Sequence, residues 1–265
     1  MKLSRLPYKI KRAVEIYGRY YLLGHTPVLV YCTGRVGSIA LFNALYKRGV
    51  FAFKVEDLNP NADRRQRGTT HWVYSHVAKP RRPAKVIFIV RNPVALMVSD
   101  FLPKLPYMTD APDPYETLTP AQMRHIFNTK YFQEGRHLEK LRWFQQQAEP
   151  YLGVDVYAQS FPQQQGYLRF RQAGYDALVI RTELDNPTKA RVVGDFVGLD
   201  DLRIERMNVG EKKDYGDAYG PFKRALTIKP EHLETIFASQ YARHFYGRAK
   251  MVEMNERWLP QPMRP

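Results

Sequence analysis

The sequence predicts an α/β domain in which a central parallel sheet is covered by helices on both faces. Short apolar runs rich in β-branched residues, which are typical of buried strands, alternate along the chain with segments of helical periodicity. The clearest strands are 28–32, 85–90 and 177–181, where nearly every residue is apolar. Such strands are buried on both sides, as they are in a parallel sheet between two layers of helices.

The other elements follow in order from periodicity and turn residues. Residues 1–25 predict an N-terminal helical extension, interrupted at Pro7, that packs on the core; contact with a membrane surface is the alternative. Its apolar stripe consists of Leu3, Leu6, Ile10, Val14 and Tyr17. Further helices are predicted over 37–48, 93–102, 120–148, 188–197 and 230–246, further strands over 51–55, 72–77, 154–158 and 167–170, and loops over 59–70, 103–119 and 203–222.

Composition limits the classes of function. A chain of 265 residues suits one domain over 1–265, and its net charge of +15 favours anionic partners. The basic residues are dispersed rather than gathered in one tail, so we expect no nucleic-acid partner. No apolar stretch is long enough to span a membrane, and the N-terminus is not a convincing signal peptide. We therefore expect a cytoplasmic location, with membrane association through 1–25 as the open alternative.

A glycine-containing turn follows the first strand and leads into a helix. Its residues are Gly34, Arg35, Val36, Gly37, Ser38 and Ile39. The glycines let a ligand approach the main chain, and the free amides at a helix start bind phosphate or sulfate. This P-loop-like turn lacks the Lys–Ser/Thr pair that a nucleotide P-loop uses for phosphate and Mg²⁺. The turn therefore predicts an anion site that works without metal. No cluster of His, Cys, Asp and Glu has metal-ligand spacing either.

A second candidate anion site follows the strand 85–90. Arg91 comes directly after this strand, and Ser99 follows eight residues later in the helix that begins at Pro93. Open α/β sheets bind ligands at the carboxyl ends of their strands. Arg91 and Ser99 are therefore expected to converge on one phosphate.

These two segments resemble the sulfotransferases that use 3′-phosphoadenosine 5′-phosphosulfate. The resemblance lies in Cys32-Thr-Gly-Arg-Val-Gly-Ser38 and in Lys85-Val-Ile-Phe-Ile-Val-Arg-Asn-Pro-Val-Ala-Leu-Met-Val-Ser-Asp-Phe101. It implies a three-layer fold in which residues 34–39 bind the 5′-phosphosulfate and Arg91 and Ser99 bind the 3′-phosphate. Other segments, including Asp155-Val-Tyr-Ala-Gln-Ser-Phe161, are similar to those of bacterial capsular polysaccharide synthesis proteins within this family. The resemblance implies a hydroxyl-bearing acceptor, a saccharide or glycolipid.

The resemblance also assigns roles to single residues. Tyr74-Ser75-His76 resembles the family's Thr-His element, which makes His76 the expected base; His71 and a carboxylate remain open as alternatives. Arg35 stands where the family has Lys, and it is expected to stabilise charge because a guanidinium does not readily donate its proton. The family's C-terminal Arg-Lys-Gly element is absent, and the segment that contains Lys212 and Lys213 is expected to close over the nucleotide in its place.

Two other classes of function stay open from the residues alone. A phosphotransferase or NTPase with a degenerate P-loop would bind ATP or GTP with Mg²⁺. A non-catalytic polyanion-binding protein would bind heparin or DNA with a steep dependence on salt, and this binding would not depend on Arg35.

Overall fold

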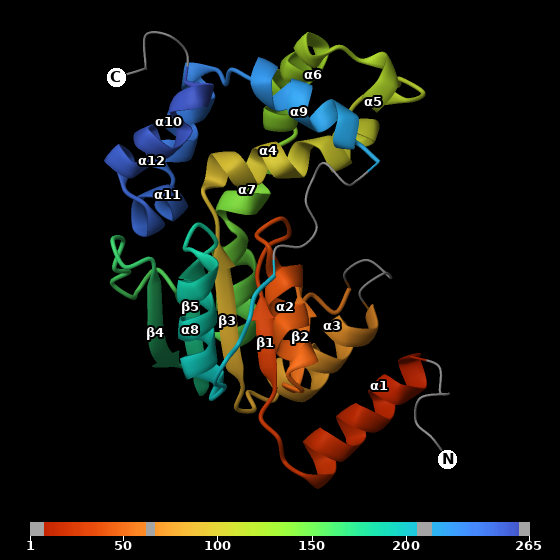
Figure 1. Ribbon diagram of the computed structural model, residues 1–265, viewed down its shortest axis with the longest axis vertical. Helices are drawn as coiled ribbons and strands as arrows, with labels where there is room; N and C mark the ends of the chain where they lie inside the picture. The colour runs from red at the N-terminus through yellow and green to blue at the C-terminus, as the bar shows by residue number, and fades with distance from the viewer. Residues whose placement is uncertain (1–7, 62–66, 206–213, 260–265) are drawn as a thin grey trace.

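Five strands form a single sheet in the order β2-β1-β3-β5-β4 (Figure 1). The computed structural model describes residues 8–61, 67–205 and 214–259. The pairs β1–β2, β1–β3 and β3–β5 are parallel, and β4 pairs antiparallel with β5 at one edge. The α/β prediction is therefore confirmed, with an antiparallel edge strand added. The strands are β1 (Val28–Tyr31), β2 (Ala52–Val55), β3 (Lys85–Val90), β4 (Tyr167–Gln172) and β5 (Tyr175–Arg181).

Helices cover both faces of the sheet and form a further layer beyond its carboxyl edge. Figure 1 shows α4, α5, α6 and α9–α12 in this further layer, above the ends of the strands. The helices are α1 (Tyr8–Ile16), α2 (Ser38–Lys47), α3 (Arg67–Val73), α4 (Pro93–Lys104), α5 (Pro114–Thr117), α6 (Pro120–Ile126), α7 (Arg136–Leu141), α8 (Asn186–Val197), α9 (Gly216–Ala225), α10 (Pro230–Ala238), α11 (Gln240–Phe245) and α12 (Arg248–Asn255). Short π-helical segments continue several of them, namely η2 (Tyr17–Leu22), η3 (Tyr74–Ala78), η5 (Phe127–Tyr131) and η6 (Phe144–Leu152).

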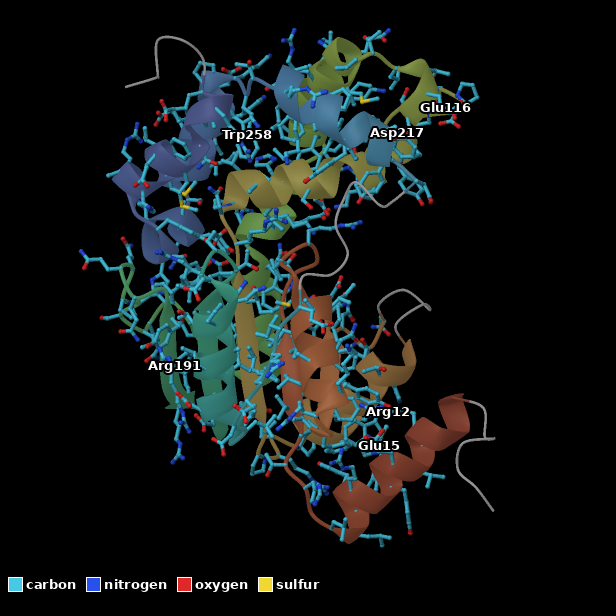
Figure 2. The ribbon with its side chains drawn as sticks, viewed as in Figure 1. Arg12, Glu15, Glu116, Arg191, Asp217 and Trp258 are labelled. Atoms are coloured by element: carbon cyan, nitrogen blue, oxygen red, sulfur yellow. The ribbon has the colours of Figure 1, made fainter. Side chains whose placement is uncertain are left out.

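The N-terminal helical segment lies against the amino end of the sheet. Arg12 donates a hydrogen bond to the carbonyl of Ala52 at the start of β2, and Figure 2 shows Arg12 and Glu15 on the side of α1 that faces the sheet. Val14 and Tyr17 were expected to pack on the core, but both are exposed because the inward side of this segment carries Arg12, Ile16 and Tyr20 instead. Within the described ranges, no helix is both long and apolar enough to cross a bilayer.

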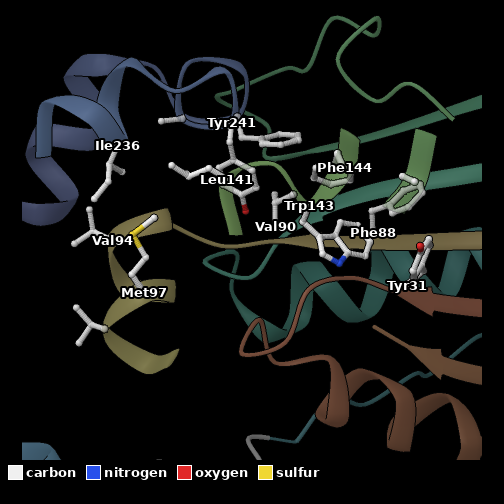
Figure 3. Packing of buried hydrophobic residues seen from close by; sticks show 14 of the residues in the cluster. Tyr31, Phe88, Val90, Val94, Met97, Leu141, Trp143, Phe144, Ile236 and Tyr241 are labelled. Carbon is white, nitrogen blue, oxygen red and sulfur yellow. The ribbon is translucent and has the colours of Figure 1, made fainter. Parts of the chain in front are cut away.

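The alternation of side chains along the strands builds two apolar cores, one on each face. In β3, Phe88 and Val90 point into the larger core, and Ile87 and Ile89 point into the smaller one. Figure 3 shows Phe88 beside Tyr31 and Trp143 in the larger core, which continues through Val94 and Met97 into the helical layer. Because this core is continuous, the helical layer is fixed against the carboxyl end of the sheet.

Two predicted strands are absent, each for a local reason. Residues 72–77 are helical, because Val73 and Val77 lie four residues apart and are both buried on one side of α3 and η3. Residues 154–158 form a turn, because the Asp155 carboxylate accepts hydrogen bonds from the amides of Tyr157 and Ala158.

Other boundaries also differ from prediction, among them the loop predicted over 59–70, which contains the start of α3. The single helix predicted over 230–246 is interrupted at Ser239, whose hydroxyl caps α11 by accepting from the amide of Ala242. The loop predicted over 103–119 contains the last residues of α4 and the short helix α5. The loop predicted over 203–222 contains the start of α9.

Candidate functional site

The loop between β1 and α2 is shaped as an anion cradle. Gly37 has φ +84° and Arg35 has φ +72°, so two of its residues are in the left-handed region. Gly37 is also the N-cap of α2 and offers no side chain to the first amides of that helix. The Thr182 hydroxyl, at the carboxyl end of β5, donates to the carbonyl of Val36 and holds the loop against the sheet. The helix start therefore presents backbone donors at the carboxyl edge of the sheet.

Arg91 lies beside this loop. Its Nη1 atom donates a hydrogen bond of 2.6 Å to the carbonyl of Arg35. The buried Tyr241 hydroxyl accepts from the Arg91 amide and donates to the Arg91 carbonyl, at 3.0 Å in each case. The structure thus brings together the two segments that the sequence singles out.

A polar network fixes the turn that carries Arg91. The Asn92 amide donates to the Glu183 carboxylate at 2.6 Å, and the Tyr246 hydroxyl donates to the same carboxylate at 3.0 Å. The Asn92 side chain caps α4 by accepting from the amides of Val94 and Ala95, and its Nδ2 donates to buried Asn255. Asn92 is buried, and the bonds of its side chain and its backbone amide together fix the backbone next to Arg91.

Ser99 lies on α4, about two turns after Arg91. At 1.5 Å per residue, its position is about 10 Å along the helix axis from Asn92. Ser99 and Ala95 are half-buried, whereas the rest of α4 up to Leu102 is buried. These two positions are four residues apart, so they form the one accessible stripe of this helix, which begins at Arg91.

The Arg35 side chain reaches the helical layer. It is hydrogen-bonded to the hydroxyl of Tyr215, the residue that precedes α9. Burial raises the pKa of Tyr215, and the neighbouring Arg35 guanidinium opposes this shift. The sequence did not single out Tyr215, because only the fold brings it to the loop. Lys212 and Lys213 lie outside the described residues.

A carboxylate that the sequence did not single out lies against the cradle. Glu56 follows β2 directly, and a Cβ atom added at Gly34 would lie 3.1 Å from its Oε2. Its Oε1 forms an ion pair of 2.5 Å with Lys54, and its side chain is 31% exposed. The sequence did offer a signal for Glu56, because it is the first polar residue after a buried strand. Such residues lie at the carboxyl edge of a parallel sheet, where ligands bind.

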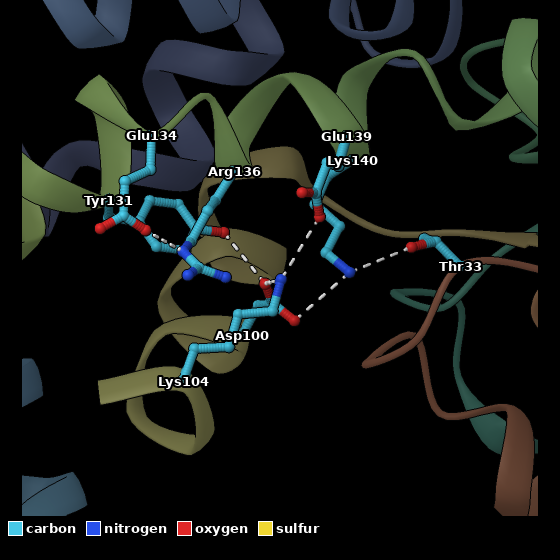
Figure 4. Close-up of polar contacts among 8 residues, drawn as sticks. All are labelled: Thr33, Asp100, Lys104, Tyr131, Glu134, Arg136, Glu139 and Lys140. Carbon is cyan, nitrogen blue, oxygen red and sulfur yellow. Dashed lines mark hydrogen bonds and ion pairs between the residues drawn. The ribbon is translucent and has the colours of Figure 1, made fainter. Parts of the chain in front are cut away.

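A buried charge cluster lies between the helical layer and the loop (Figure 4). The Asp100 carboxylate forms ion pairs with Lys104 at 2.9 Å and with Lys140 at 3.3 Å, and it accepts from the Tyr131 hydroxyl at 3.2 Å. Burial would raise the pKa of Asp100, but the two lysines outweigh it and the pKa is lowered. The Lys140 ammonium also donates to the Thr33 hydroxyl at 3.4 Å, so the cluster reaches the first residues of the loop.

His76 is not part of this assembly. It lies in η3, where its Nδ1 is 2.9 Å from the carbonyl of Trp72 and its ring stacks on that indole. Its own carbonyl accepts from Tyr20 in the N-terminal segment. These contacts lie at the side and amino end of the sheet, whereas the cradle lies at the carboxyl end. The structure therefore does not bring His76 together with Arg35 and Arg91. His71, the alternative, is exposed on the neighbouring turn.

Ser38 turns inward from the cradle. Its hydroxyl is buried and hydrogen-bonded to the Cys32 sulfur. Burial, together with the nearby Glu56 carboxylate, raises the pKa of Cys32 to about 12, so this thiol stays protonated. Val36 is also buried, whereas Ile39 is partly exposed at the first turn of α2.

An apolar cavity of about 140 Å³ opens beside the cradle. Its walls come from the loop, from β3 and β5, from α8 and from residues just before 206. They include Val36, Gly37, Ile89, Ile180, Lys189 and Ile204. Over the ranges that the structure describes, no group of three or more His, Cys, Asp or Glu is arranged to hold a metal ion.

The comparisons with known proteins bear on the second half of the chain. Searches of curated proteins and of solved structures found no match. The family model described as "Putative capsular polysaccharide synthesis protein" matches residues 122–247, slightly less than half of the chain. This range includes Lys140, Glu183, Tyr215 and Tyr241, but neither the cradle nor Arg91. Over this range the chain is similar to capsular polysaccharide synthesis proteins.

Proposed function

We propose that the protein is a sulfotransferase that moves a sulfuryl group from 3′-phosphoadenosine 5′-phosphosulfate to a hydroxyl of a saccharide. The hydrogen bond from Arg91 to the Arg35 carbonyl carries this proposal. It joins a strand-end arginine to a glycine-containing cradle at one edge of the sheet, and the donor nucleotide is a molecule with two separate anionic groups. A site for a single phosphate has no need for both segments.

The charges of the site match the two ends of the donor. The cradle amides and Arg35 would bind the phosphosulfate, and Arg91 with Ser99 would bind the 3′-phosphate. Arg35 and Arg91 are permanently charged and have several donors each, which suits them to stabilise the charge that develops on the departing phosphate. The apolar cavity beside Gly37 would accept the adenine ring, because its volume of about 140 Å³ and its aliphatic walls suit a flat base. Lys212 and Lys213 remain predicted to close over the nucleotide.

Glu56 is better placed than His76 to activate the acceptor. A carboxylate beside an anion cradle repels the ligand, so its presence at Gly34 favours a role in proton transfer. In the reaction, the acceptor oxygen forms a bond to sulfur while the bond between sulfur and the 5′-phosphate oxygen breaks. The hydroxyl proton passes to Glu56, and the products are a sulfate ester and adenosine 3′,5′-bisphosphate.

The saccharide is the acceptor class that the family match favours. The matched range 122–247 includes α7 and Tyr215, which lie around the open side of the cradle. The matching family model carries the description "Putative capsular polysaccharide synthesis protein", and a capsular polysaccharide has many sugar hydroxyl groups.

Titration calorimetry with adenosine 3′,5′-bisphosphate in the absence of metal tests the proposal. We expect the wild-type protein to bind, and Arg91→Ala to lose about tenfold or more in affinity, since a charge-assisted hydrogen bond contributes about 1.5–3 kcal/mol. Arg191→Ala is the matched control, because Arg191 is an exposed arginine on α8 away from the cradle. It should bind like the wild type.

Each alternative class of function gives a different result in the same experiment. Binding of ATP or GTP that requires Mg²⁺, with no bisphosphate binding, would assign the site to a phosphotransferase. Binding of heparin that is equal in wild type and Arg35→Ala would indicate a polyanion-binding protein. Incubation with labelled donor and an oligosaccharide acceptor then tests for transfer itself.

A further inference from the structure

An exposed apolar patch lies on the outward side of the N-terminal segment. We call it the N-terminal patch; it comprises Val14, Tyr17, Tyr21, Leu22 and Leu23, which are between 46% and 69% exposed. Over the described part of the chain, the structure exposes eight large hydrophobic side chains, and five of them are in this patch. Single exposed apolar residues are ordinary, but a cluster of this kind indicates a binding surface.

The patch cannot turn inward, because the opposite side of the segment is tied to the sheet. Arg12 donates to the Ala52 carbonyl at 2.7 Å, and Arg19 donates to the Gly49 carbonyl. Tyr20 donates to the His76 carbonyl at 2.7 Å and packs edge-on against Trp72. The segment therefore presents its apolar side to the surroundings as a fixed surface.

Exposed basic residues lie on both sides of the patch. On one side, the turn before β3 carries Lys79 and Arg82, and the Arg82 guanidinium lies over the Tyr20 ring at 5.8 Å. On the other side, the end of α2 carries Lys47 and Arg48, next to Gly49, which accepts from Arg19.

These four basic residues, Lys47, Arg48, Lys79 and Arg82, form a basic rim around the patch. Positive charges outnumber the carboxylates that lie near them. Glu15 is held by Arg12 at 2.7 Å and by Arg19 at 3.2 Å. Glu205 pairs with Lys47 at 3.3 Å, and Asp201 lines the same cavity as Lys47, Arg48 and Arg203. Lys79, Arg48 and Arg82 make no ion pair within the described ranges. Arg48 donates to the Asp200 carbonyl at 3.1 Å and Arg82 to the Tyr20 hydroxyl at 3.4 Å, but neither partner carries a charge, so these cations can still attract negative groups outside the protein.

We propose that the N-terminal patch docks the protein on an anionic membrane surface. Leucine and tyrosine side chains insert at the boundary between headgroups and acyl chains, while the surrounding lysines and arginines attract acidic headgroups. A second copy of the chain fits less well. A twofold dimer through this patch would place one basic rim against the other, and like charges at an interface oppose association.

Co-sedimentation with vesicles tests this proposal and does not depend on the activity of the cradle. The full-length protein is mixed with vesicles of phosphatidylcholine that contain phosphatidylglycerol, and with vesicles of phosphatidylcholine alone. We expect binding to the first kind, weaker binding to the second, and a decrease as salt is raised. The double variant Leu22→Ser with Leu23→Ser should lose about tenfold in partitioning, because both side chains are already exposed in the folded protein and contribute apolar area only when docked.

Tyr107→Ser is the matched control. Tyr107 is 76% exposed but lies in the helical layer, away from the patch, so this variant should bind vesicles like the wild type. Equal binding by the double variant, or no binding of the wild type to anionic vesicles, would overturn the proposal. So would a dimer in sedimentation velocity that the double variant dissociates, because it would assign the patch to self-association. An unchanged midpoint in urea unfolding shows that the double variant is folded, whether or not the cradle binds a nucleotide.

Discussion

Replacing Asp100 by asparagine should destabilise the protein substantially, because the carboxylate neutralises two cations in a place that water hardly reaches. The Asp100 side chain is 5% exposed, and those of Lys104 and Lys140 are 23% and 12% exposed. Removing one partner of a buried ion pair costs about 3–5 kcal/mol, since the other charge stays behind unpaired. Lys104 also reaches Glu139 at 3.5 Å, which relieves part of this cost. We therefore expect a loss of about 3 kcal/mol from the free energy of unfolding.

Urea unfolding at neutral pH measures this loss, and the chain supplies a matched control. Arg191 and Asp195 on α8 have the same spacing as the Asp100–Lys104 pair, but their side chains are 60% and 70% exposed. Exposed pairs of this kind contribute less than about 1 kcal/mol. Asp195→Asn should therefore change the unfolding midpoint only slightly. Equal losses for the two variants would refute the argument that burial makes the Asp100 cluster important.

The loss of stability in Asp100→Asn should depend on pH. The lysines lower the pKa of Asp100 in the folded protein below its value in the unfolded chain. The stability that this carboxylate contributes is therefore fully present above the unfolded pKa, about 3.9, and is lost as the pH falls through the lower folded value. The difference in unfolding free energy between wild type and Asp100→Asn should stay constant at about 3 kcal/mol from pH 5 to 7. It should become smaller in more acidic solution, where the carboxylate is protonated.

Three further variants test the cradle. Gly37→Ala should cost about 1–2 kcal/mol in urea unfolding, because φ is +84° and the new Cβ would lie 3.3 Å from a threonine hydroxyl; Gly24→Ala, at φ +63° in open space, should cost less. Tyr241→Phe should lose about 1–3 kcal/mol of stability and weaken bisphosphate binding, because it leaves the Arg91 amide without its acceptor. Glu56→Gln should lower the transfer rate about 100-fold, while bisphosphate affinity rises because the substitution removes a carboxylate that repels the anion; an unchanged rate would exclude Glu56 as the base.

The strands could be predicted where the sequence pattern is dictated by burial on both faces. In β1, β3 and β5 nearly every side chain enters one of the two cores, so their continuous apolar runs were sufficient. The segment 72–77 has the aromatic and β-branched residues of a strand, yet it is helical. Its length is too short for periodicity to separate the two structures, and contacts with Tyr20 and the sheet decide it.

The candidate site could be predicted only where its residues follow one another in sequence. The cradle and Arg91 each follow a strand directly, so the rule that ligands bind at the carboxyl edge was enough to single them out. Tyr215 is hydrogen-bonded to Arg35, 180 residues earlier in the chain, and Lys140 is hydrogen-bonded to Thr33, 107 residues earlier. These contacts depend on how the helical layer sits over the sheet, which no local pattern encodes.

The two proposed surfaces lie at opposite ends of the sheet, and this arrangement constrains the acceptor. The cradle follows the carboxyl ends of β1 and β3, whereas the N-terminal segment that carries the patch is tied to the amino end of β2 and to His76 in η3, which leads to the amino end of β3. A strand the length of β3 alone spans about 20 Å. With the patch on a membrane, the cradle therefore faces away from the lipid. A sugar attached directly to a lipid headgroup cannot reach it, whereas the distal part of a long saccharide chain can. Of the two acceptors that the resemblance implies, a saccharide and a glycolipid, the arrangement favours a long saccharide chain over a short glycolipid.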